Sequence, residues 1–499
     1  MQGLRELLEN IKKKGQTVVV AGLGKSGIQA SLLLKNSGYP VIAIDENVTA
    51  ELLSRVEVLH KANIDTCLGI AAERKIEDAA LVVVSPGIPP SSPVIKRAIR
   101  CKVPVVSELD LAWALMPVEP KMTIAVTGTN GKTTVTTLLY FLLEKSGQKT
   151  ILAGNVGDPL STYCSQITRE TMLVLEVSSF QLYFSINFEP DTAAILNITP
   201  DHFDWHSDFR DYIRAKRRLI ALLKKNGQVV LNLDDPVVCR FRPRAGQKVI
   251  WFTLEKDIGL PDLAYYDGSD VVLRIGSKEV MRVERNLFSG IGNHNTENLL
   301  ATVSLAWMAG LKEDLIKRYL PEYQLQPHRL QEIARLGPIV FVDDSKATNS
   351  DAARRAIESF NGETLICLLG GKPKEADYSG LADAIKKTGA TVVVFGEAKN
   401  IFYEQFAGMG ITVFAAENLK EAVETAVKLA LSSSAEIKPV FDTPVDVQLR
   451  STVSKLKNKV VVLLSPACAS FDEFNSYRER GEKFREYVLN LIEKGTSRV

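Results

Sequence analysis

Short, uninterrupted apolar runs that alternate with helical patterns constrain this chain more than any other feature. Clear examples are TVVVA at 17–21, MTIAVT at 122–127 and VVVLLSPA at 460–467. A strand that is apolar along its whole length is buried on both faces, which is typical of a parallel sheet covered by helices. Because the strand–helix rhythm recurs along the chain, the sequence predicts an α/β fold built from doubly wound, Rossmann-like sheets.

The length of 499 residues allows about three domains. Proline punctuation near 117–120 and a change of pattern near 323–327 predict domains at 1–117, 118–325 and 326–499. Between about 265 and 288, short alternating runs with Gly and Asp turns predict an antiparallel hairpin added to the central sheet. Residues 432–459 show little periodicity, so we expect a loop or insertion there.

The composition argues against several classes of partner. A net charge of +2 gives no strong field for nucleic acid, and the basic stretch 214–225 predicts an amphipathic helix with a solvated basic face. No apolar run approaches the roughly 18 residues of a membrane span, and the N-terminus does not resemble a signal peptide. The six widely spaced cysteines are expected to be free thiols. We therefore expect a cytoplasmic protein.

A phosphate-binding loop is predicted between an apolar strand and a helix. It consists of Gly128, Thr129, Asn130, Gly131, Lys132, Thr133 and Thr134. Its small residues let backbone amides turn toward phosphate oxygens, and the helix N-terminus adds its positive end. Lys132 is expected to neutralise the β- and γ-phosphates of ATP, and the Thr133 hydroxyl to bind magnesium. Because Val126 replaces the first glycine of the usual pattern, an ordinary strand–helix turn is the alternative.

Two polar residues downstream also follow apolar strands. Glu176 ends the run LVLE, and His202 follows AAILNIT. Ligands of open α/β sheets bind at the carboxyl ends of the strands, so both side chains are candidates to hold magnesium between ATP and a second substrate. The alternatives are a Glu176–lysine pair and a zinc pair of His202 with His206, for which no third ligand stands out.

A complete Gly-x-Gly-x-x-Gly pattern lies between the first strand and its helix. Its members are Gly22, Gly24 and Gly27. Asp45 ends the next strand, which is the arrangement of a dinucleotide site. A UDP-sugar satisfies the same physical requirements as NAD, namely a pyrophosphate at a helix N-terminus and an acid near a hydroxyl. A second tight turn at 85–88 is suited to close over the same ligand.

Taken in order, the motifs resemble the Mur ligase family over nearly the whole chain. The matching segments are GLGKSG (22–27), SPG (85–87), TGTNGKTT (127–134), EVSSFQL (176–182), NITPDH (197–202), GIGNHNTENLLA (290–301), PHR (327–329), DDSKATN (343–349), LLGG (368–371) and SPACASFDEFNSYRERG (465–481). EVSSFQL and the last segment look most like the member that adds D-glutamate.

The resemblance implies a UDP-substrate domain, a central ATP-binding domain and a C-terminal domain that brings the amino acid. It also implies a ligation in peptidoglycan precursor synthesis. The carboxylate of UDP-N-acetylmuramoyl-L-alanine would attack the γ-phosphate of ATP, and the amine of D-glutamate would then displace phosphate from the acyl-phosphate. Two magnesium ions, a monomer and no nucleic-acid or membrane partner are expected.

The resemblance further implies roles for individual residues. Catalytic or metal-binding roles fall to Lys132, Thr133, Glu176, His202, Lys216, His328 and Lys346, and Lys216 matches a lysine that the family carbamylates. Contacts to ATP are expected from residues 128–134, Asn298, Arg329 and Asp344. Contacts to the UDP-substrate are expected from Leu23, Gly24, Lys25, Ser26, Asp45, Ser85, Gly87, Asn155, Ser178 and Ser179. Contacts to D-glutamate are expected from Thr348, Lys374, Ser470 and Tyr477, with Lys372 as the alternative to Lys374.

Three other functions remain open at this stage. A folylpolyglutamate-type ligase is opposed by the glycine fingerprint and by the segment SPACAS. An NAD-dependent oxidoreductase would leave the loop at 128–134 unexplained. A non-catalytic nucleotide switch would leave Glu176, His202, Asp344 and Lys346 without a common purpose.

Overall fold

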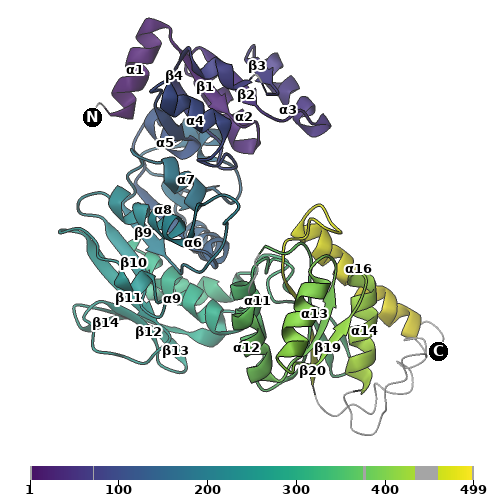
Figure 1. Ribbon diagram of the computed structural model, residues 1–499. Coiled ribbons are helices and arrows are strands. Elements are labelled where there is room, and N and C mark those ends of the chain that lie inside the picture. The colour runs from purple at the N-terminus through teal and green to yellow at the C-terminus, as the bar shows by residue number, and fades with distance from the viewer. Residues whose placement is uncertain (1–2, 71, 375–377, 433–458, 497–499) are drawn as a thin grey trace. The chain divides into compact units, whose positions relative to one another are not determined.

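The computed structural model describes residues 3–70, 72–374, 378–432 and 459–496 (Figure 1). The chain forms two compact units, Met1–Phe288 with Thr296–Tyr323, and Ser289–Asn295 with Gln324–Val499. The first unit holds two sheets and the second holds one, which confirms the expected α/β architecture of three sheets. The loop or insertion expected at 432–459 lies, apart from its two ends, outside the described residues. The domain boundaries at 117 and 325 stay predictions.

The first sheet is fully parallel and has the strand order β3-β2-β1-β4-β5. Its strands are β1 (Thr17–Ala21), β2 (Val41–Asp45), β3 (Asp65–Leu68), β4 (Ala79–Val84) and β5 (Val105–Ser107). The helices are α1 (Leu4–Lys14), α2 (Lys25–Asn36), α3 (Ala50–Lys61), α4 (Pro93–Arg100) and α5 (Glu108–Leu115). The strand order reverses between β1 and β4, and ligands of doubly wound sheets bind at such a reversal. The glycine loop and the second turn follow these two strands.

The second sheet contains nine strands in the order β14-β13-β12-β11-β10-β9-β6-β8-β7. The strands are β6 (Met122–Thr127), β7 (Thr150–Gly154), β8 (Met172–Glu176), β9 (Thr192–Ile195), β10 (Gln228–Asn232), β11 (Lys248–Thr253), β12 (Leu263–Tyr266), β13 (Asp270–Ile275) and β14 (Lys278–Glu284). Only β12, β13 and β14 pair antiparallel among them, which confirms the predicted hairpin. The helices are α6 (Lys132–Lys145), α7 (Ser179–Phe184), α8 (Phe209–Leu222), α9 (Asn293–Met308) and α10 (Glu313–Tyr319).

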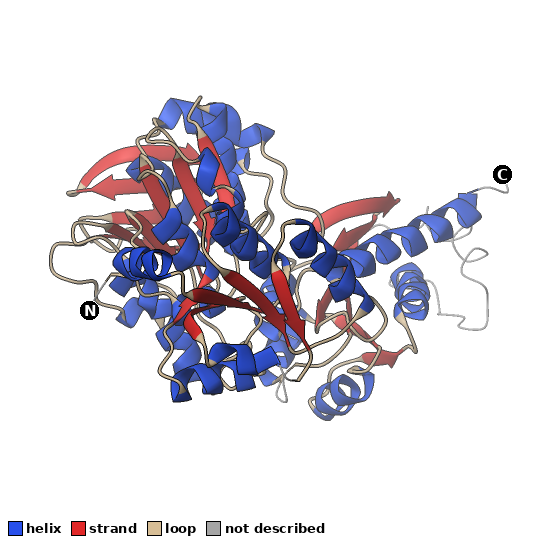
Figure 2. Ribbon diagram, turned by 90° about the horizontal axis from the view of Figure 1, so that it is seen from above, coloured by secondary structure: helices blue, strands red, loops and turns tan. Residues whose placement is uncertain are grey.

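The third sheet has the order β15-β16-β20-β17-β18-β19, with β15 antiparallel to its neighbour. The strands are β15 (Gln331–Leu336), β16 (Ile339–Asp343), β17 (Thr364–Gly370), β18 (Thr391–Phe395), β19 (Val413–Ala415) and β20 (Val460–Ala467). The helices are α11 (Ser350–Glu358), α12 (Ser379–Thr388), α13 (Lys399–Gly408), α14 (Leu419–Ser432) and α16 (Tyr477–Thr496). One face carries α11, α12 and α13, and the other carries α14 and α16, so each sheet face has its own core (Figures 1 and 2).

The burial of the strands explains why apolar runs form them. Every residue of β8, β9, β16 and β20 is buried. Burial of one Val, Leu or Ile side chain contributes about 1.5–3 kcal/mol, so a strand covered on both faces is apolar throughout. In the described ranges, no helix combines the length and apolar character needed to cross a bilayer.

Candidate active site

The phosphate loop leaves the middle of the second sheet. β6 lies between β9 and β8, so the loop that follows it is flanked by the ends of both neighbours. Gly131 has a φ of 86° and immediately precedes α6. A Cβ atom at this position would lie 2.3 Å from Asn298 Oδ1, so only glycine fits. The structure thereby brings Asn298, a residue expected at the ATP site, against the loop.

A dense hydrogen-bond network fixes the conformation of the loop. Lys132 Nζ donates to the carbonyl oxygens of Gly128 and Thr129, both at 2.9 Å. The Thr129 hydroxyl lies 3.1 Å from Tyr212 Oη, and the Asn130 N–H donates to Asn197 Oδ1 at 2.8 Å. Neither Tyr212 nor Asn197 was singled out from the sequence, because each lies far along the chain from the loop, and Asn197 entered only as the first residue of the segment NITPDH.

Glu176 ends β8 directly beside the phosphate-loop strand, with Val126 as its register partner. Its side chain is buried, and Oε1 accepts a hydrogen bond from Asn155 Nδ2 at 2.6 Å. Oε2 has no hydrogen-bond partner among the described residues, although it is buried. A buried carboxylate oxygen without a donor is costly unless a ligand neutralises it, so this atom fits a bound cation.

Lys216 points inward from α8 and is fully buried. Its Nζ donates to the carbonyl oxygen of Gly128 at 2.7 Å. Burial, followed by the nearby charge of Lys132, holds the pKa of Lys216 well below its ordinary value. Arg214 and Arg217 on the same helix are exposed, which confirms the predicted solvated basic face, but Lys216 does not belong to that face.

The two histidines of the segment 202–206 have different surroundings. His202 has a φ of 58°, is half-buried, and its ring lies 4.8 Å from that of Phe180. His206 is buried, with Nδ1 at 3.0 Å from Asp211 Oδ2 and Nε2 at 3.0 Å from Ser179 Oγ. Because both ring nitrogens of His206 are engaged, a zinc pair with His202 is not formed. Within the described part of the chain, no group of three or more His, Cys, Asp or Glu residues is arranged to hold a metal.

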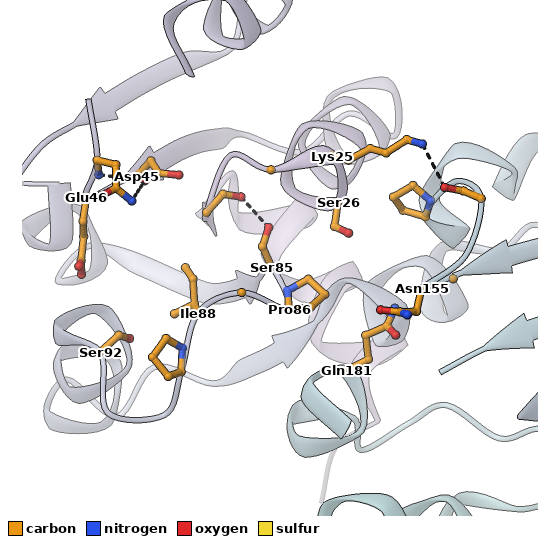
Figure 3. Close-up of a pocket in the computed structure, with 18 residues that line it drawn as sticks. Lys25, Ser26, Asp45, Glu46, Ser85, Pro86, Ile88, Ser92, Asn155 and Gln181 are labelled. Carbon is orange, nitrogen blue, oxygen red and sulfur yellow. Dashed lines mark hydrogen bonds between the residues drawn. The ribbon is translucent and has the colours of Figure 1, made fainter. Parts of the chain in front are cut away.

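A cavity of about 540 Å³ lies over the glycine loop of the first sheet (Figure 3). Gly22 has a φ of 87°, and a Cβ atom on Gly27 would lie 1.8 Å from the Gly22 carbonyl oxygen. Ser85 Oγ donates to that oxygen at 2.6 Å. Asp45 Oδ2 accepts a hydrogen bond from the Leu23 N–H at 2.8 Å, so one carboxylate oxygen already stabilises the loop. The cavity is the place for a pyrophosphate at the N-terminus of α2.

Both sheets of the first unit contribute to this cavity. Lys25 Nζ pairs with Asp158 Oδ1 at 2.7 Å and donates to the Gly157 carbonyl oxygen at 3.0 Å. Asn155 and Gln181 line the cavity from the second sheet (Figure 3). Asn155 therefore contacts the cavity on one side and Glu176, beside the phosphate loop, on the other.

Several expected contacts of the UDP-substrate line the cavity. They are Gly24, Lys25, Ser26, Asp45, Ser85, Gly87 and Asn155. Ser178 and Ser179 instead have local partners. Ser178 forms a capping box with Gln181 at the start of α7, and the Ser179 hydroxyl is hydrogen-bonded to Nε2 of His206.

The second unit brings three of its predicted residues together, namely His328, Lys346 and Tyr477. His328 Nδ1 lies 2.6 Å from Asp343 Oδ2, and the Lys346 N–H donates to the His328 carbonyl oxygen. Lys346 Nζ lies 3.9 Å from the centre of the Tyr477 ring. Burial raises the pKa of Asp344 to about 7, although Ser465 donates a hydrogen bond to its carboxylate and Arg329 lies close enough to lower it.

The residues expected to bind the amino acid differ in their exposure. Ser470 is buried, Thr348 is half-buried and Lys374 is exposed. The backbone of Lys372 pairs with Ala469 in an isolated bridge, which places Lys372 next to Ser470.

Arg480 organises this region and was not identified from the sequence. It is fully buried, and burial lowers its pKa to about 10. Its guanidinium donates to the carbonyl oxygens of Ser345, Cys468 and Ala469 and to the Ser345 hydroxyl. One side chain thus holds the loop after β16 against the loop after β20.

Three family models match successive parts of the chain between residues 16 and 435. A model described as "Mur ligase MurD-like, N-terminal domain" matches residues 16–107, and "Mur ligase middle domain" matches 126–306. A third, "Mur ligase, glutamate ligase domain", matches residues 328–435.

Curated relatives are similar over their full length. A Koribacter versatilis protein named UDP-N-acetylmuramoylalanine--D-glutamate ligase is 34% identical, covering 96% of this chain and 99% of its own. A protein of the same name from Shouchella clausii is 33% identical and covers 99% of both chains.

Solved structures share the fold at lower identity. UDP-N-acetylmuramate-alanine ligase MurC from Thermotoga maritima has a TM-score of 0.56 and 18% identity, covering 95% of this chain and 99% of its own. MurF from Acinetobacter baumannii has a TM-score of 0.56 and 16% identity, covering 90% of this chain and 86% of its own. Sequence motifs, family models, full-length relatives and fold agree, and the chain therefore belongs to the Mur ligase family.

Proposed function

We propose that the protein joins D-glutamate to UDP-N-acetylmuramoyl-L-alanine at the expense of ATP. The proposal depends mainly on a link between two sites of the first unit, the cavity over the glycine loop at 22–27 and the phosphate loop at 128–134. Asn155 lines the glycine-loop cavity and donates to Glu176, which lies beside the phosphate loop. An acid held by its nucleotide in the cavity would extend toward a triphosphate on the loop. The names of the full-length relatives favour D-glutamate as the amino acid.

The proposed reaction has two steps. A carboxylate oxygen of the UDP-substrate attacks the γ-phosphorus, the bond to ADP breaks, and an acyl-phosphate forms. The amine of D-glutamate then attacks the acyl carbon, loses a proton and displaces inorganic phosphate. Backbone amides of residues 128–132 bind the polyphosphate, and Lys132 neutralises the charge that develops on it. Asn298 and Arg329 complete the ATP contacts in this proposal.

The described residues fit the magnesium ions that the family implies. Thr133, Glu176 and His202 are the protein groups that would hold them, and the unpartnered Oε2 of Glu176 supports this. Bound magnesium would neutralise phosphate charge and orient the phosphoryl group. Lys216 fits carbamylation, because burial lowers its pKa and so favours the neutral amine, the form that attacks carbon dioxide. The carbamate would then replace a buried amine by an anion facing the phosphate loop.

In the second unit, we assign the reaction-site contacts to His328, Asp344 and Lys346. D-Glutamate, with two carboxylates, suits a lysine together with hydroxyl groups. Thr348, Ser470 and Tyr477 supply the hydroxyls, and Lys374 or Lys372 supplies the cation. A cytoplasmic monomer accords with the use of ATP and a nucleotide-linked precursor.

A four-component assay tests this function. Phosphate release is expected only when ATP, magnesium, UDP-N-acetylmuramoyl-L-alanine and D-glutamate are present together. L-Glutamate, L-alanine and a diamino acid serve as controls and should give no product. Full phosphate release without an amino acid would contradict the ligase assignment, and preference for another amino acid would reassign the substrate. Tight binding of NADH in the glycine-loop cavity would instead support an oxidoreductase.

A further inference from the structure

His328 and Asp343 form a dyad at the edge of the third sheet. His328 precedes β15, and Asp343 is the last residue of β16. His328 Nδ1 and Asp343 Oδ2 are 2.6 Å apart, with 13% and 1% of the side chains exposed. The second carboxylate oxygen accepts a hydrogen bond from the Ser345 N–H at 2.8 Å. Both oxygens of Asp343 therefore have assigned partners, one of them the imidazole.

The backbone at His328 is held in an uncommon conformation. His328 has a φ of 65°, which non-glycine residues rarely adopt. Its N–H donates to Gln331 Oε1 at 3.2 Å, and its carbonyl oxygen accepts from the Lys346 N–H at 3.2 Å. Such conformations persist only where surrounding contacts hold the backbone in place, and they cluster at functional sites. The imidazole is thus aimed by contacts on both sides of its own backbone.

A glycine in α16 makes room for the dyad. A Cβ atom on Gly481 would lie 2.1 Å from His328 Nδ1 and 2.7 Å from Asp343 Oδ2. Any other residue would push into the hydrogen bond itself. Gly481 follows Arg480, whose guanidinium holds Ser345, so the residues that surround Asp343 are fixed by the same helix.

We propose that Asp343 is a positioning residue that holds one tautomer and one orientation of His328 for the ligation reaction. A carboxylate accepts and does not donate, so Nδ1 carries the hydrogen that bridges to Asp343. Nε2 forms no hydrogen bond with any residue that the structure describes, and it is the ring nitrogen presented to the substrates. This proposal rests on the proposed function only for the identity of the substrate on which His328 acts.

Nitrogen NMR of histidine-labelled full-length protein tests the tautomer directly. The chain has only five histidines, so loss of one set of signals in His328→Gln assigns the residue. In the wild type, His328 Nδ1 is expected to be protonated. In Asp343→Asn, the amide oxygen should keep the Ser345 hydrogen bond and turn the NH₂ group toward Nδ1. His328 should then switch to the tautomer with hydrogen on Nε2.

Gly481→Ala provides a second, independent variant. Its methyl group should separate His328 from Asp343 and abolish the Nδ1 bridge while both side chains remain. Gly408→Ala is the matched control, because a Cβ atom at that helical glycine meets nothing within 4 Å. Its His328 signals and turnover should equal those of the wild type. If Asp343→Asn fails to fold, as judged by circular dichroism, Gly481→Ala still decides.

Kinetics should show the functional consequence. We expect both variants to lower kcat by about tenfold or more, the scale expected when the partner of a functional histidine is lost. KM for the UDP-substrate should change little, since its cavity lies in the other unit. Nε2 protonation in the wild type, or an unchanged Nδ1 signal in both variants, would overturn the proposal. A wild type that lacks ligase activity would contradict the proposed function but leave the tautomer result intact.

Discussion

The side-chain nitrogens of two lysines share the carbonyl oxygen of Gly128. Lys132 Nζ lies 2.9 Å from this oxygen and Lys216 Nζ lies 2.7 Å from it. Two positive charges so close together repel, and the fully buried lysine loses its proton more readily. Burial therefore favours the neutral amine at Lys216, and we assign the phosphate contact to Lys132. The two lysines differ in burial, since Lys132 is half-buried and Lys216 is fully buried.

Replacement of Lys132 by alanine should abolish phosphate release. The reason is that the polyphosphate loses its neutralising charge, whereas the glycine-loop cavity loses no contact. Calorimetric titration should give near-normal affinity for UDP-N-acetylmuramoyl-L-alanine. Lys145→Ala is the control on the same helix, since Lys145 pairs with Glu322 at the surface. Its turnover should match the wild type, and a Lys132→Ala variant with retained turnover would refute the assignment.

The buried carboxyl of Asp344 should make stability depend on pH. Its pKa is about 7 in the folded protein, above the ordinary value of 3.8. Between these values the folded state binds a proton that the unfolded state has lost, so the stabilising contribution falls as pH rises from about 4 to about 7. Asp344→Asn, which cannot ionise, should gain stability relative to the wild type across this window. Thermal unfolding at pH 5, 6, 7 and 8 measures the difference, and a constant difference would contradict the shift.

At the scale of elements, the strands with long apolar runs were predicted correctly. Four strands were not named from the sequence: β3, β7, β11 and β15. Three of them are edge strands, and their residues are only partly buried, so the apolar signal is weak. β11 begins with an exposed lysine and alternates with half-buried residues. For β3, β7 and β15, the edge position accounts for the weak apolar signal.

The close packing of Gly131 in the phosphate loop against Asn298 can be tested by substitution. Gly131→Ala should abolish ATP binding, because its φ is positive and the methyl group would collide with Asn298 Oδ1. Gly147→Ala is the matched control, with a similar φ of 80° but no atom within 4 Å of the added Cβ. The control should lose only about 1–2 kcal/mol of stability from the left-handed backbone and keep ATP affinity. If both variants bound ATP equally well, the methyl group at position 131 would not disturb the loop, and the prediction would be wrong.

At the scale of the whole molecule, α5 explains why two sheets form one compact unit. Leu111 contributes to the core of the first sheet, and Leu109 contributes to that of the second. Asp110 accepts hydrogen bonds from three successive backbone amides of residues 186–188, and burial raises its pKa to about 6. This helix was not predicted to join domains, because the relevant partners lie about 75 residues away along the chain.

Differential scanning calorimetry should resolve the two units. UDP-N-acetylmuramoyl-L-alanine should raise the unfolding temperature of one transition only, since its cavity lies wholly in the first unit. A ligand at 100 times its Kd stabilises the unit that binds it by about 2.7 kcal/mol. D-Glutamate alone should not shift this transition. A single transition that shifts as a whole would indicate that the two units unfold together.

In the candidate site, the residues that could be predicted from the sequence differ from those that could not in whether they belong to a local pattern. The phosphate loop, Glu176 and the glycine loop were predicted because each is a local pattern at a strand end. Tyr212, Asn197, Asp343, Arg480 and Gly481 were not, because their importance comes from contacts between distant segments. Family resemblance supplied His328 and Lys216, and only the structure shows what surrounds them.

The contact between Asn155 and Glu176 also bears on ion selectivity. One oxygen of the carboxylate is already committed to the amide, so the residue offers a cation a single donor atom. Monodentate binding suits the compact octahedral shell of Mg²⁺, whereas Ca²⁺ readily accepts chelation by both oxygens of a carboxylate. The neutral amide of Asn155 would thereby favour Mg²⁺ over Ca²⁺, an ion of equal charge, at this carboxylate.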